Sequence, residues 1–183
     1  MAWAVRKEPP KEAETKAGVV KISTEESPTL EITKTFFGQR ARTDWERKKT
    51  AYRIFLTPLG SPEEKEIGNA EVLYRKVSDI RHPAMHAIFK NAGLKEDDKI
   101  AMINVFYPIP FEEKDTPAGT KLVVPSKELS RKGIARAVIT EVLEKCKSDG
   151  AKVAYGCTTK PEMQALLTNF GFQRTEYFYL KML

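Results

Sequence analysis

Apolar residues recur at helical spacing in one stretch toward the C-terminus. The run Leu122-Val123-Val124 is followed by a basic turn that contains a glycine, after which Ile134, Val138 and Val142 recur every fourth residue. This spacing places the three side chains on one face of a helix. The pattern therefore predicts a strand, a tight turn and an amphipathic helix that ends at about Ser148.

The residues that follow predict three more elements. Residues 151–157 have the pattern of a short strand, and residues 161–170 that of a second helix, which closes at Gly171-Phe172. The chain ends in an aromatic, strand-like run at 177–180. The C-terminal part of the chain is therefore expected to alternate helices with strands.

The N-terminal half is dominated by β-type patterns. Strands are predicted at 19–22, 30–37, 51–56 and 99–107, and a helix at 82–93. The charged residues 38–49 predict a solvated connection or a short helix, residues 61–64 resemble a helix start, and residues 71–77 fit either a strand or a helix.

The first seventeen residues differ in composition from the rest. They are charged, contain prolines and are poor in large apolar groups, which is typical of a flexible tail. We therefore predict a tail at 1–17 and a single domain at 18–183. The order of elements predicts an α+β fold with a mixed sheet and helices packed on it.

Composition and charge narrow the functional classes. The 183 residues carry a formal net charge of +6 and only two cysteines, Cys146 and Cys157, a count that favours a reducing, intracellular setting. No apolar run is long enough to cross a membrane, and residues 1–16 lack the apolar region of a secretory signal, so we expect a cytoplasmic protein. His82 and His86 stand four residues apart, a spacing that can chelate a metal, but no third ligand is evident and no metal is expected.

The basic turn before the predicted helix suits an anion. A helix N-terminus exposes unpaired N–H groups and a positive dipole end. Gly133 allows the backbone to approach a ligand closely or to take a positive φ angle. Arg131, Lys132 and Arg136 add positive charge around it. A single glycine between basic residues is also common at solvated helix starts, so this motif alone does not decide between the two.

Residues 99–183 resemble the C-terminal half of the GNAT superfamily, the acyl-CoA-dependent N-acyltransferases. The loop signature of that family is Gln or Arg, two residues, Gly, one residue, then Gly or Ala. It matches at Gly133 and Ala135, while Ser130 occupies the first position and Arg131 lies next to it. The second marker, a helix that ends in Gly-Phe before a strand, matches at Gly171-Phe172.

The resemblance implies a three-layer α/β arrangement with a mixed, mostly antiparallel sheet and flanking helices. It also implies an N-acetyltransferase that moves an acyl group from acetyl-CoA to an amine by direct transfer in a ternary complex. Acetyl-CoA would be the co-substrate, and the acceptor would be a small-molecule or protein amine. The residues expected along its pantetheine arm are Leu122, Val123, Val124 and Ser126; those around its pyrophosphate are Arg131, Lys132, Gly133, Ile134, Ala135 and Arg136; and Thr158 follows the adjacent strand.

The catalytic groups are harder to assign. The family often places an acidic tyrosine four residues before the Gly of Gly-Phe, and this position is Leu167 here. Tyr155 is a candidate acid, with aromatic core packing as the alternative. Glu128 is a candidate base, with a surface carboxylate as the alternative. Cys157 has no visible histidine partner, which favours a structural thiol over a nucleophile.

Two other functional classes stay open. Leu167 and Ser130 favour a non-catalytic GNAT-like domain that binds a CoA-type ligand or a protein partner. The net charge and the basic stretch 40–49 favour a nucleic-acid-associated protein, although Asp44 and Glu46 dilute that stretch. The acyl length and the oligomeric state, a homodimer included, are left open by the sequence.

Overall fold

The computed structural model describes the backbone of residues 5–35, 38–107, 111–115, 117, 119, 121–125, 131–159 and 161–183. Within these ranges, side chains are described except those of residues 30–43, 104–107, 111–115, 121–125 and 162.

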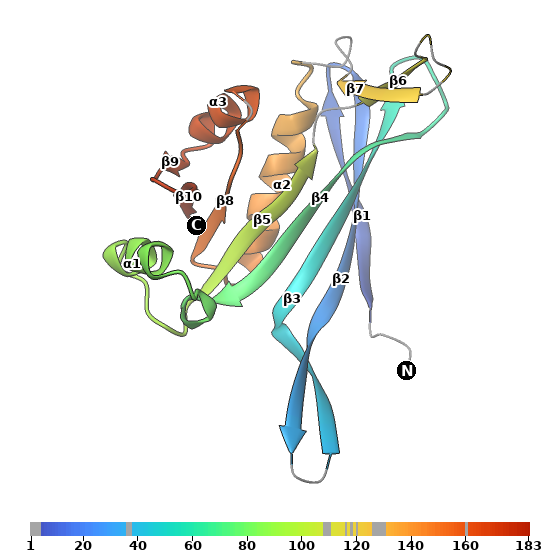
Figure 1. Ribbon diagram of the computed structural model, residues 1–183. Coiled ribbons are helices and arrows are strands. Elements are labelled where there is room, and N and C mark those ends of the chain that lie inside the picture. Colours follow the sequence, from blue (N-terminus) through green and yellow to red (C-terminus); the bar gives the residue numbers. More distant parts are fainter. Residues whose placement is uncertain are drawn as a thin grey trace.

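A single large sheet runs through the molecule, with eight strands in the order β1-β2-β3-β4-β5-β8-β10-β9 (Figure 1). The strands are β1 (Arg6–Thr15), β2 (Gly18–Thr35), β3 (Gly38–Pro58), β4 (Lys65–Lys76), β5 (Lys99–Tyr107), β8 (Val153–Gly156), β9 (Gln173–Arg174) and β10 (Tyr179–Met182). All described neighbours in it are antiparallel except β5 and β8, which are parallel. The expected mixed, mostly antiparallel sheet of an α+β protein is confirmed.

The helices cover the two faces of this sheet unequally. Their bounds are α1 (Pro83–Asn91), α2 (Ile134–Ser148) and α3 (Pro161–Asn169), with a short 3-10 helix, η1 (Val77–Asp79). Val138 and Val142 of α2 are fully buried against β2, β3 and β4, and Ile139 joins α3 and β8 in a second cluster. On the opposite face, Phe89 of α1 packs on Tyr155 and Phe178. Helices α2 and α3 therefore share one face, and α1 covers part of the other.

The helical spacing read from the sequence is confirmed in α2. The side chains of Ile134, Val138 and Val142 are buried, as are Ile139 and Cys146, and they form one stripe along the helix. Gly150 follows the helix with φ of 81°. Helices commonly end at a residue in this left-handed conformation, and glycine is preferred there because it has no Cβ. The predicted helices at 82–93 and 161–170 and the predicted strands at 99–107 and 151–157 also match the structure closely.

The prediction of a flexible tail is wrong for residues 6–15. These residues form β1, which pairs with β2 from Arg6↔Glu26 to Thr15↔Gly18. An edge strand is half exposed, so it needs few apolar side chains, and this explains the misleading composition. The register shifts between Glu8 and Lys11, around Pro9 and Pro10, which have no N–H to donate to a ladder.

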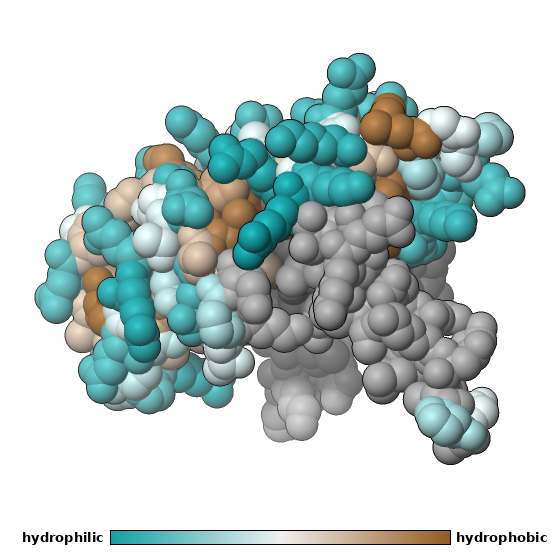
Figure 2. All heavy atoms as spheres, turned by 90° about the horizontal axis from the view of Figure 1, so that it is seen from above, coloured by the Kyte–Doolittle hydropathy of each residue, from teal (hydrophilic) through white to brown (hydrophobic). Residues whose placement is uncertain are grey.

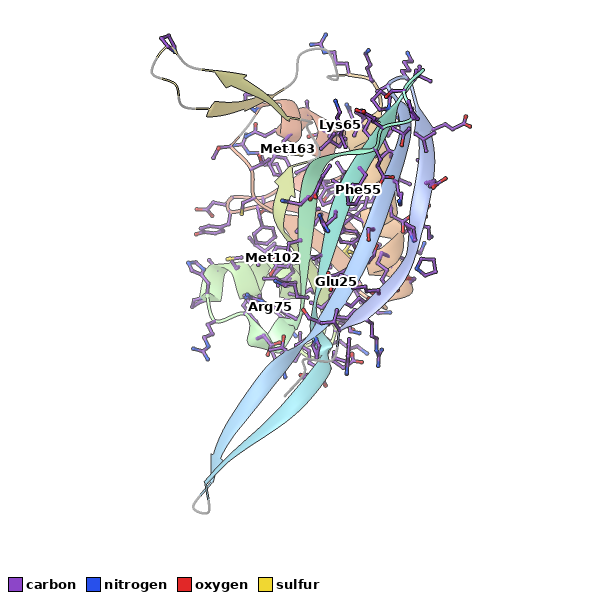
Figure 3. The ribbon with its side chains drawn as sticks, turned by 90° about the vertical axis from the view of Figure 1, so that its right-hand side faces the viewer. Glu25, Phe55, Lys65, Arg75, Met102 and Met163 are labelled. Atoms are coloured by element: carbon purple, nitrogen blue, oxygen red, sulfur yellow. The ribbon has the colours of Figure 1, made fainter. Side chains whose placement is uncertain are left out.

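A long two-stranded ribbon extends from the sheet. The pairing of β1 ends at Glu26 and that of β4 at Lys49, whereas β2 and β3 continue to pair with each other as far as Thr35↔Gly38 (Figures 1 and 3). The expectation of a connection or short helix at 38–49 is therefore wrong. The charged side chains that suggested it are compatible with a ribbon that is open to solvent.

The segment before α1 also differs from its prediction. Residues 61–64 form no helix, and residues 65–76 form β4, so the undecided stretch at 71–77 is a strand up to Lys76. On the face of the sheet away from α2, ion pairs link Lys21 to Glu64 and Arg53 to Glu66. In the described part of the chain, no helix is both long and apolar enough to span a membrane.

Candidate functional site

The N-terminus of α2 begins from a loop with unusual backbone geometry. Arg131 has φ of 59° and Gly133, the N-cap residue, has φ of 93°. Gly133 accepts the first helical hydrogen bond, from Ala137 N at 3.0 Å, and no side chain caps the helix. The N–H groups of the first turn therefore have no intrahelical acceptor. The first turn contains no acidic residue, so the positive end of the helix dipole is not neutralised there.

The turn between β1 and β2 holds this loop in place. Lys16 N donates a hydrogen bond to Lys132 O at 3.0 Å. The turn is itself braced by Thr15, whose Oγ1 donates to Gly18 O at 2.8 Å and accepts from Ala17 N at 3.2 Å. The loop thus rests on an ordered hairpin, which helps to support its left-handed residues.

Several cations surround the loop, and the described residues include no carboxylate partner for them. Arg131 and Arg136 are exposed and Lys132 is half-buried. Within the ranges that the structure describes, none of the three side chains forms an ion pair or a hydrogen bond with an acid. Figure 2 views this end of the molecule, where hydrophilic side chains prevail on the described surface. The residues 131–136, which the sequence analysis placed around a pyrophosphate, therefore carry positive charge that no acid among the described residues neutralises.

The parallel strands β5 and β8 separate beside α2, the helix that follows this loop. Their pairing ends at Ile103↔Gly156, whereas β5 continues to Tyr107 and stays paired with β4. Among the described residues, one edge of β5 therefore has no neighbouring strand after Ile103. At the last pair the strands are tightly apposed, since a Cβ on Gly156 would lie 3.0 Å from Ile103 O.

A small slot opens where the two strands part. Its volume is about 70 Å³. Its walls are mainly apolar and come from β5, α2, α3 and the chain that follows β8; the lining residues are Ile103, Ile139, Val142, Gly156, Cys157, Thr158, Met163, Leu167 and Phe172. Of the residues expected at the cofactor, Thr158 lies here. The slot is thus an apolar recess with a polar rim beyond the end of β8.

The strand beside this slot is not the one expected from the sequence. Leu122, Val123 and Val124 lie in β7 (Lys121–Pro125), which pairs with β6 (Phe111–Asp115) in a separate two-stranded sheet. The strand that parts from β8 is β5. Pro108 and Pro110 follow Tyr107 and suggested that β5 ends there. The sequence pattern therefore assigned the strand next to the slot to residues 122–126, which follow β5 in the chain, and not to β5 itself. Ser126 and Glu128 lie outside the described residues.

Tyr155 faces away from the slot. It is 2% exposed and lies in the aromatic cluster under α1, with ring centroids 5.1 Å from Phe89 and 5.3 Å from Phe178. Its hydroxyl has no hydrogen-bond partner among the described residues, and burial raises its pKa to about 12. The structure therefore places Tyr155 in the core, in keeping with the packing alternative, and does not bring it to the slot.

Leu167 and Cys157 have contrasting surroundings in the slot. Leu167 is buried and packs with Ile139 and Phe172, so an apolar side chain fills the position where the family often has a tyrosine. Cys157 is exposed, and its Sγ donates to Tyr177 O at 3.2 Å. No histidine contacts this thiol in the described part of the chain. The slot can thus bind a ligand through its shape and its backbone groups, but its described lining provides few side chains for acid–base catalysis.

A second, larger groove lies on the other side of the α2 N-terminus. It has a volume of about 840 Å³ and runs between β1 and α2, from Lys11–Lys16 on one wall to Arg136, Thr140 and Glu141 on the other. The loop 131–133 closes one end. Sequence patterns did not indicate this groove, because its β1 wall belongs to the segment expected to be a tail.

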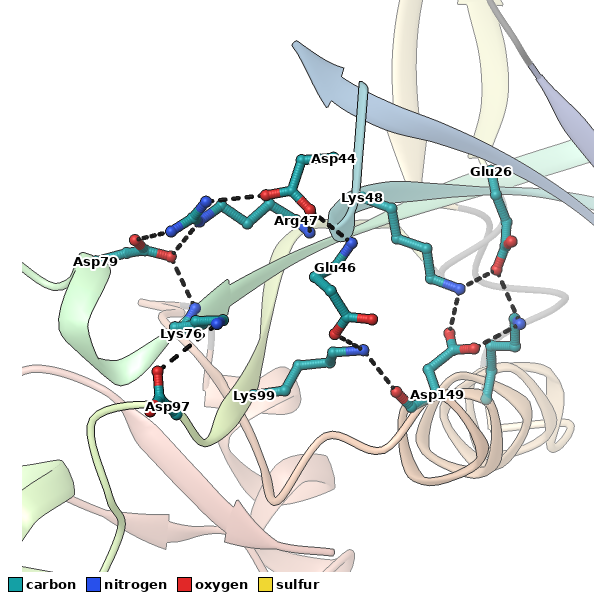
Figure 4. A network of polar contacts seen from close by, with 11 residues as sticks. Glu26, Asp44, Glu46, Arg47, Lys48, Lys76, Asp79, Asp97, Lys99 and Asp149 are labelled. Atoms are coloured by element: carbon teal, nitrogen blue, oxygen red, sulfur yellow. Dashed lines mark hydrogen bonds and ion pairs between the residues drawn. The ribbon is translucent and has the colours of Figure 1, made fainter. Parts of the chain in front are cut away.

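The opposite end of α2 is fixed by a buried ionic network (Figure 4). Lys145 lies 2.8 Å from Glu26 and 3.0 Å from Asp149, and Lys48 contacts both of these carboxylates. The two histidines take no part in such a cluster: His82 caps α1, and His86 lies 3.0 Å from Glu96. Among the described residues, no three metal-ligating side chains gather at one point.

The slot and the groove include residues that the sequence did not single out, such as Ile103, Met163 and Lys11. Each belongs to an element far from the loop in sequence, and no local motif marks it. In comparisons with known proteins, no family model and no curated protein sequence matches this chain.

Proposed function

We propose that this protein is an acyl-CoA-dependent N-acyltransferase of the GNAT type, most simply an acetyltransferase. One observation carries the proposal: the pairing of β5 with β8 ends at Ile103 and Gly156, and the connection between these two strands contains a basic loop at the N-terminus of α2. The apolar slot is lined by Ile139 and Val142 of the same helix.

The unpaired edge of β5 suits the pantetheine arm of the donor. This arm is an extended chain with two amide groups, and its amides can hydrogen-bond with a strand edge as a missing neighbour would. The loop amides and the cations Arg131, Lys132 and Arg136 would then meet the pyrophosphate. The thioester would reach the slot beside Cys157 and Thr158.

The chemistry at the slot is a direct transfer. The acceptor nitrogen attacks the thioester carbonyl, the C–N bond forms as the C–S bond breaks, the amine loses its proton and the CoA thiolate gains one. Backbone N–H groups at the strand ends are the natural donors to the oxyanion. Because Leu167 is apolar and Tyr155 is remote, proton transfer through water and alignment of the two substrates would supply the acceleration.

Titration calorimetry with acetyl-CoA tests the donor site. We expect micromolar binding to the wild-type protein and loss of binding in Gly133→Glu, because a carboxylate would face the pyrophosphate. Gly60→Glu is the matched control. Gly60 has φ of 78° and open space around its Cβ position, so the same substitution adds the same charge and similar backbone strain away from the loop. Thermal unfolding of both variants shows whether they fold.

Two results would reject the proposal. The wild-type protein could fail to bind acetyl-CoA at all, or Gly133→Glu could bind as tightly as Gly60→Glu. Either result would show that the loop is not the pyrophosphate site.

A non-catalytic CoA-binding domain is the second candidate, and Leu167 favours it. In a non-catalytic domain, acetyl-CoA would bind but no acetylated product would form with any amine. Mass spectrometry of a mixed amine library with acetyl-CoA separates the two candidates. Acetylation that disappears in Gly133→Glu favours the enzyme.

The described side chains argue against a nucleic-acid interface at residues 40–49. Arg47 pairs with Asp44 and Asp79, Lys48 with Glu26 and Asp149, and Lys49 with Glu71. These cations are already neutralised within the protein, which leaves them little attraction for phosphate. The acyltransferase remains the function that the geometry supports best.

A further inference from the structure

The slot beyond the end of β8 has no charged side chain in its described lining. Among the residues that form it, only Cys157 and Thr158 carry a thiol or a hydroxyl group. The Sγ atom of Cys157 already donates to Tyr177 O. A carboxylate placed in this slot would therefore lose its hydration without gaining a cationic partner among the described residues.

One wall of the slot belongs to α3. Met163 and Leu167 stand four residues apart, so they lie on the same face of this helix. Both are buried, at 7% and 6% exposure, and both belong to one core cluster with Ile139 of α2. The slot is therefore bounded by side chains of two helices that meet beside it.

The end of α3 fixes the position of this wall. Gly171 has φ of 80°, and Phe172 N donates to Leu167 O at 3.0 Å. This is a hydrogen-bond pattern of helices that end at a left-handed residue. Phe172 lines the slot and packs with Leu167 and Met163. Because a well-packed core resists overpacking, the wall should not retreat from a larger ligand.

The volume of the slot limits the size of its occupant. This volume is about 70 Å³, and one water molecule takes up about 30 Å³ in the liquid, so the slot has room for roughly two groups of that size. The methyl and carbonyl groups of an acetyl thioester meet this limit. A longer chain would have to displace the apolar side chains of the wall.

We infer that the slot selects the acyl group of the donor: it admits a short, uncharged acyl group and rejects longer and acidic ones, with Met163 and Leu167 setting the length limit. The inference rests on the proposed function and adds the class of donor to it. A thioester of about acetyl size is accepted, whereas hexanoyl and succinyl thioesters are not.

Leu167 has a role of its own in this account. The position that often carries a tyrosine in the family is filled here by a buried apolar side chain. Its contribution is then to the fit of the acyl group and not to proton transfer.

The test compares acetyl-CoA, hexanoyl-CoA, succinyl-CoA and free CoA by titration calorimetry. Free CoA gives the affinity without an acyl group, so the difference from it isolates the contribution of the slot. Wild-type protein should bind hexanoyl-CoA and succinyl-CoA more weakly than acetyl-CoA, each on the order of tenfold, because one does not fit and the other buries an unpaired charge.

Leu167→Ala removes part of the α3 wall. It should improve the affinity for hexanoyl-CoA relative to acetyl-CoA on the order of tenfold, because the longer chain can enter the space that is left. The variant adds no cation, so succinyl-CoA should still bind weakly. Met163→Ala opens the same face of α3 and makes the same test if Leu167→Ala does not fold.

The matched control is Leu94→Ala. Leu94 is buried to a similar extent, at 5% exposure, but it belongs to the cluster under α1 and does not line the slot. Its truncation should lower stability and leave the ratio of the affinities for the two donors as in wild type. Thermal unfolding of all variants shows which of them fold.

The outcomes separate the inference from the function on which it rests. Equal affinity of wild type for acetyl-CoA and hexanoyl-CoA, or the same ratio in the slot variant and in Leu94→Ala, would overturn the length limit. Succinyl-CoA bound as tightly as acetyl-CoA would overturn the exclusion of acidic groups. These results leave the acyltransferase proposal intact, whereas no binding of any of these compounds, free CoA included, would overturn both. A change of ratio confined to the slot variant supports the inference.

Discussion

Glu26 is a charged side chain in an almost fully enclosed place, at 4% exposure. Burial by itself would raise its pKa, but hydrogen bonds from Lys145 and Lys48 outweigh that effect and lower the pKa below the ordinary 4.5. The same balance of effects acts on Asp149. Burial would raise its pKa, but hydrogen bonds from Lys48 and Lys145 lower it below the ordinary 3.8. Removal of one partner from such a buried cluster leaves another charge without compensation and destabilises the protein.

Glu26→Gln should lower the free energy of unfolding by about 2 kcal/mol, because a buried charge-assisted hydrogen bond is removed while Asp149 still partners both lysines. Urea titration measures the change. Glu25→Gln is the control: Glu25 is 45% exposed in its pair with Lys7, so its loss should cost no more than about 0.5 kcal/mol.

The same variant should change the pH dependence of stability. A carboxylate whose pKa is lowered by folding adds stability above its unfolded pKa and loses it as the pH falls toward the folded value. The difference in the free energy of unfolding between wild type and Glu26→Gln should therefore be largest near neutrality. It should decrease below about pH 4.5, the ordinary pKa of the group. A difference that persists unchanged into acid would show that the charge of Glu26 is not what stabilises the fold.

At the residue scale, local geometry could be predicted from the sequence and long-range contacts could not. Gly133 was expected to need a special backbone, and its φ of 93° agrees. Nothing near Glu26 in the chain indicates that Lys145 will lie 2.8 Å from it. The role of Tyr155 depended on which side of β8 it faces, and the packing of α1 decides that.

At the scale of elements, the helices and the central strands could be predicted because their patterns are local. The burial stripe of α2 and the apolar run of β5 match the sequence-based boundaries. The strand β1 and the outer part of β3 could not, because their stability comes from pairing with β2 and not from their own apolar content. The position of the slot was missed for a related reason, since it depends on which strand pairs with β8.

Removal of the outer ribbon should leave the rest of the fold stable. Thr29 and Asp44 face each other across β2 and β3, so an Asn-Gly turn in place of residues 30–43 closes the hairpin at that pair. Among the described residues, the backbone of the removed part forms strand pairs only within the ribbon. We expect the free energy of unfolding to change by less than about 1 kcal/mol, because a two-stranded ribbon contributes little on its own.

Urea titration of the shortened chain against the full chain measures this. A loss of several kcal/mol would show that the ribbon stabilises the sheet. Acetyl-CoA binding by both chains then shows whether the ribbon affects the donor site.

At the scale of the whole molecule, α2 connects the two halves of the sheet. Val138 and Val142 belong to the core with β2, β3 and β4, and Ile139 and Leu143 belong to the core with β8, α3 and β10. One helix thus contributes to both cores, and neither half can lose it without exposing apolar surface. We expect the domain to unfold as one unit.

Native-state hydrogen exchange tests this expectation. The slowest amides of β3 and β4 should exchange with the same opening free energy as those of β8 and β10, within about 1 kcal/mol. A clearly lower value for β8 and β10 would show that the C-terminal half opens by itself.

The two outer strands of the large sheet have a consequence for behaviour at high concentration. An open strand edge is a template on which other chains can assemble into aggregates. At one end of the sheet, Pro9 and Pro10 interrupt the donors of β1, and the register shift there distorts the edge. At the other end, β9 offers only Gln173–Arg174, which is too short to guide a second chain. Both edges are thereby protected against fibre-like growth, while the stretch from Lys11 to Thr15 keeps regular pairing with β2 beside the groove.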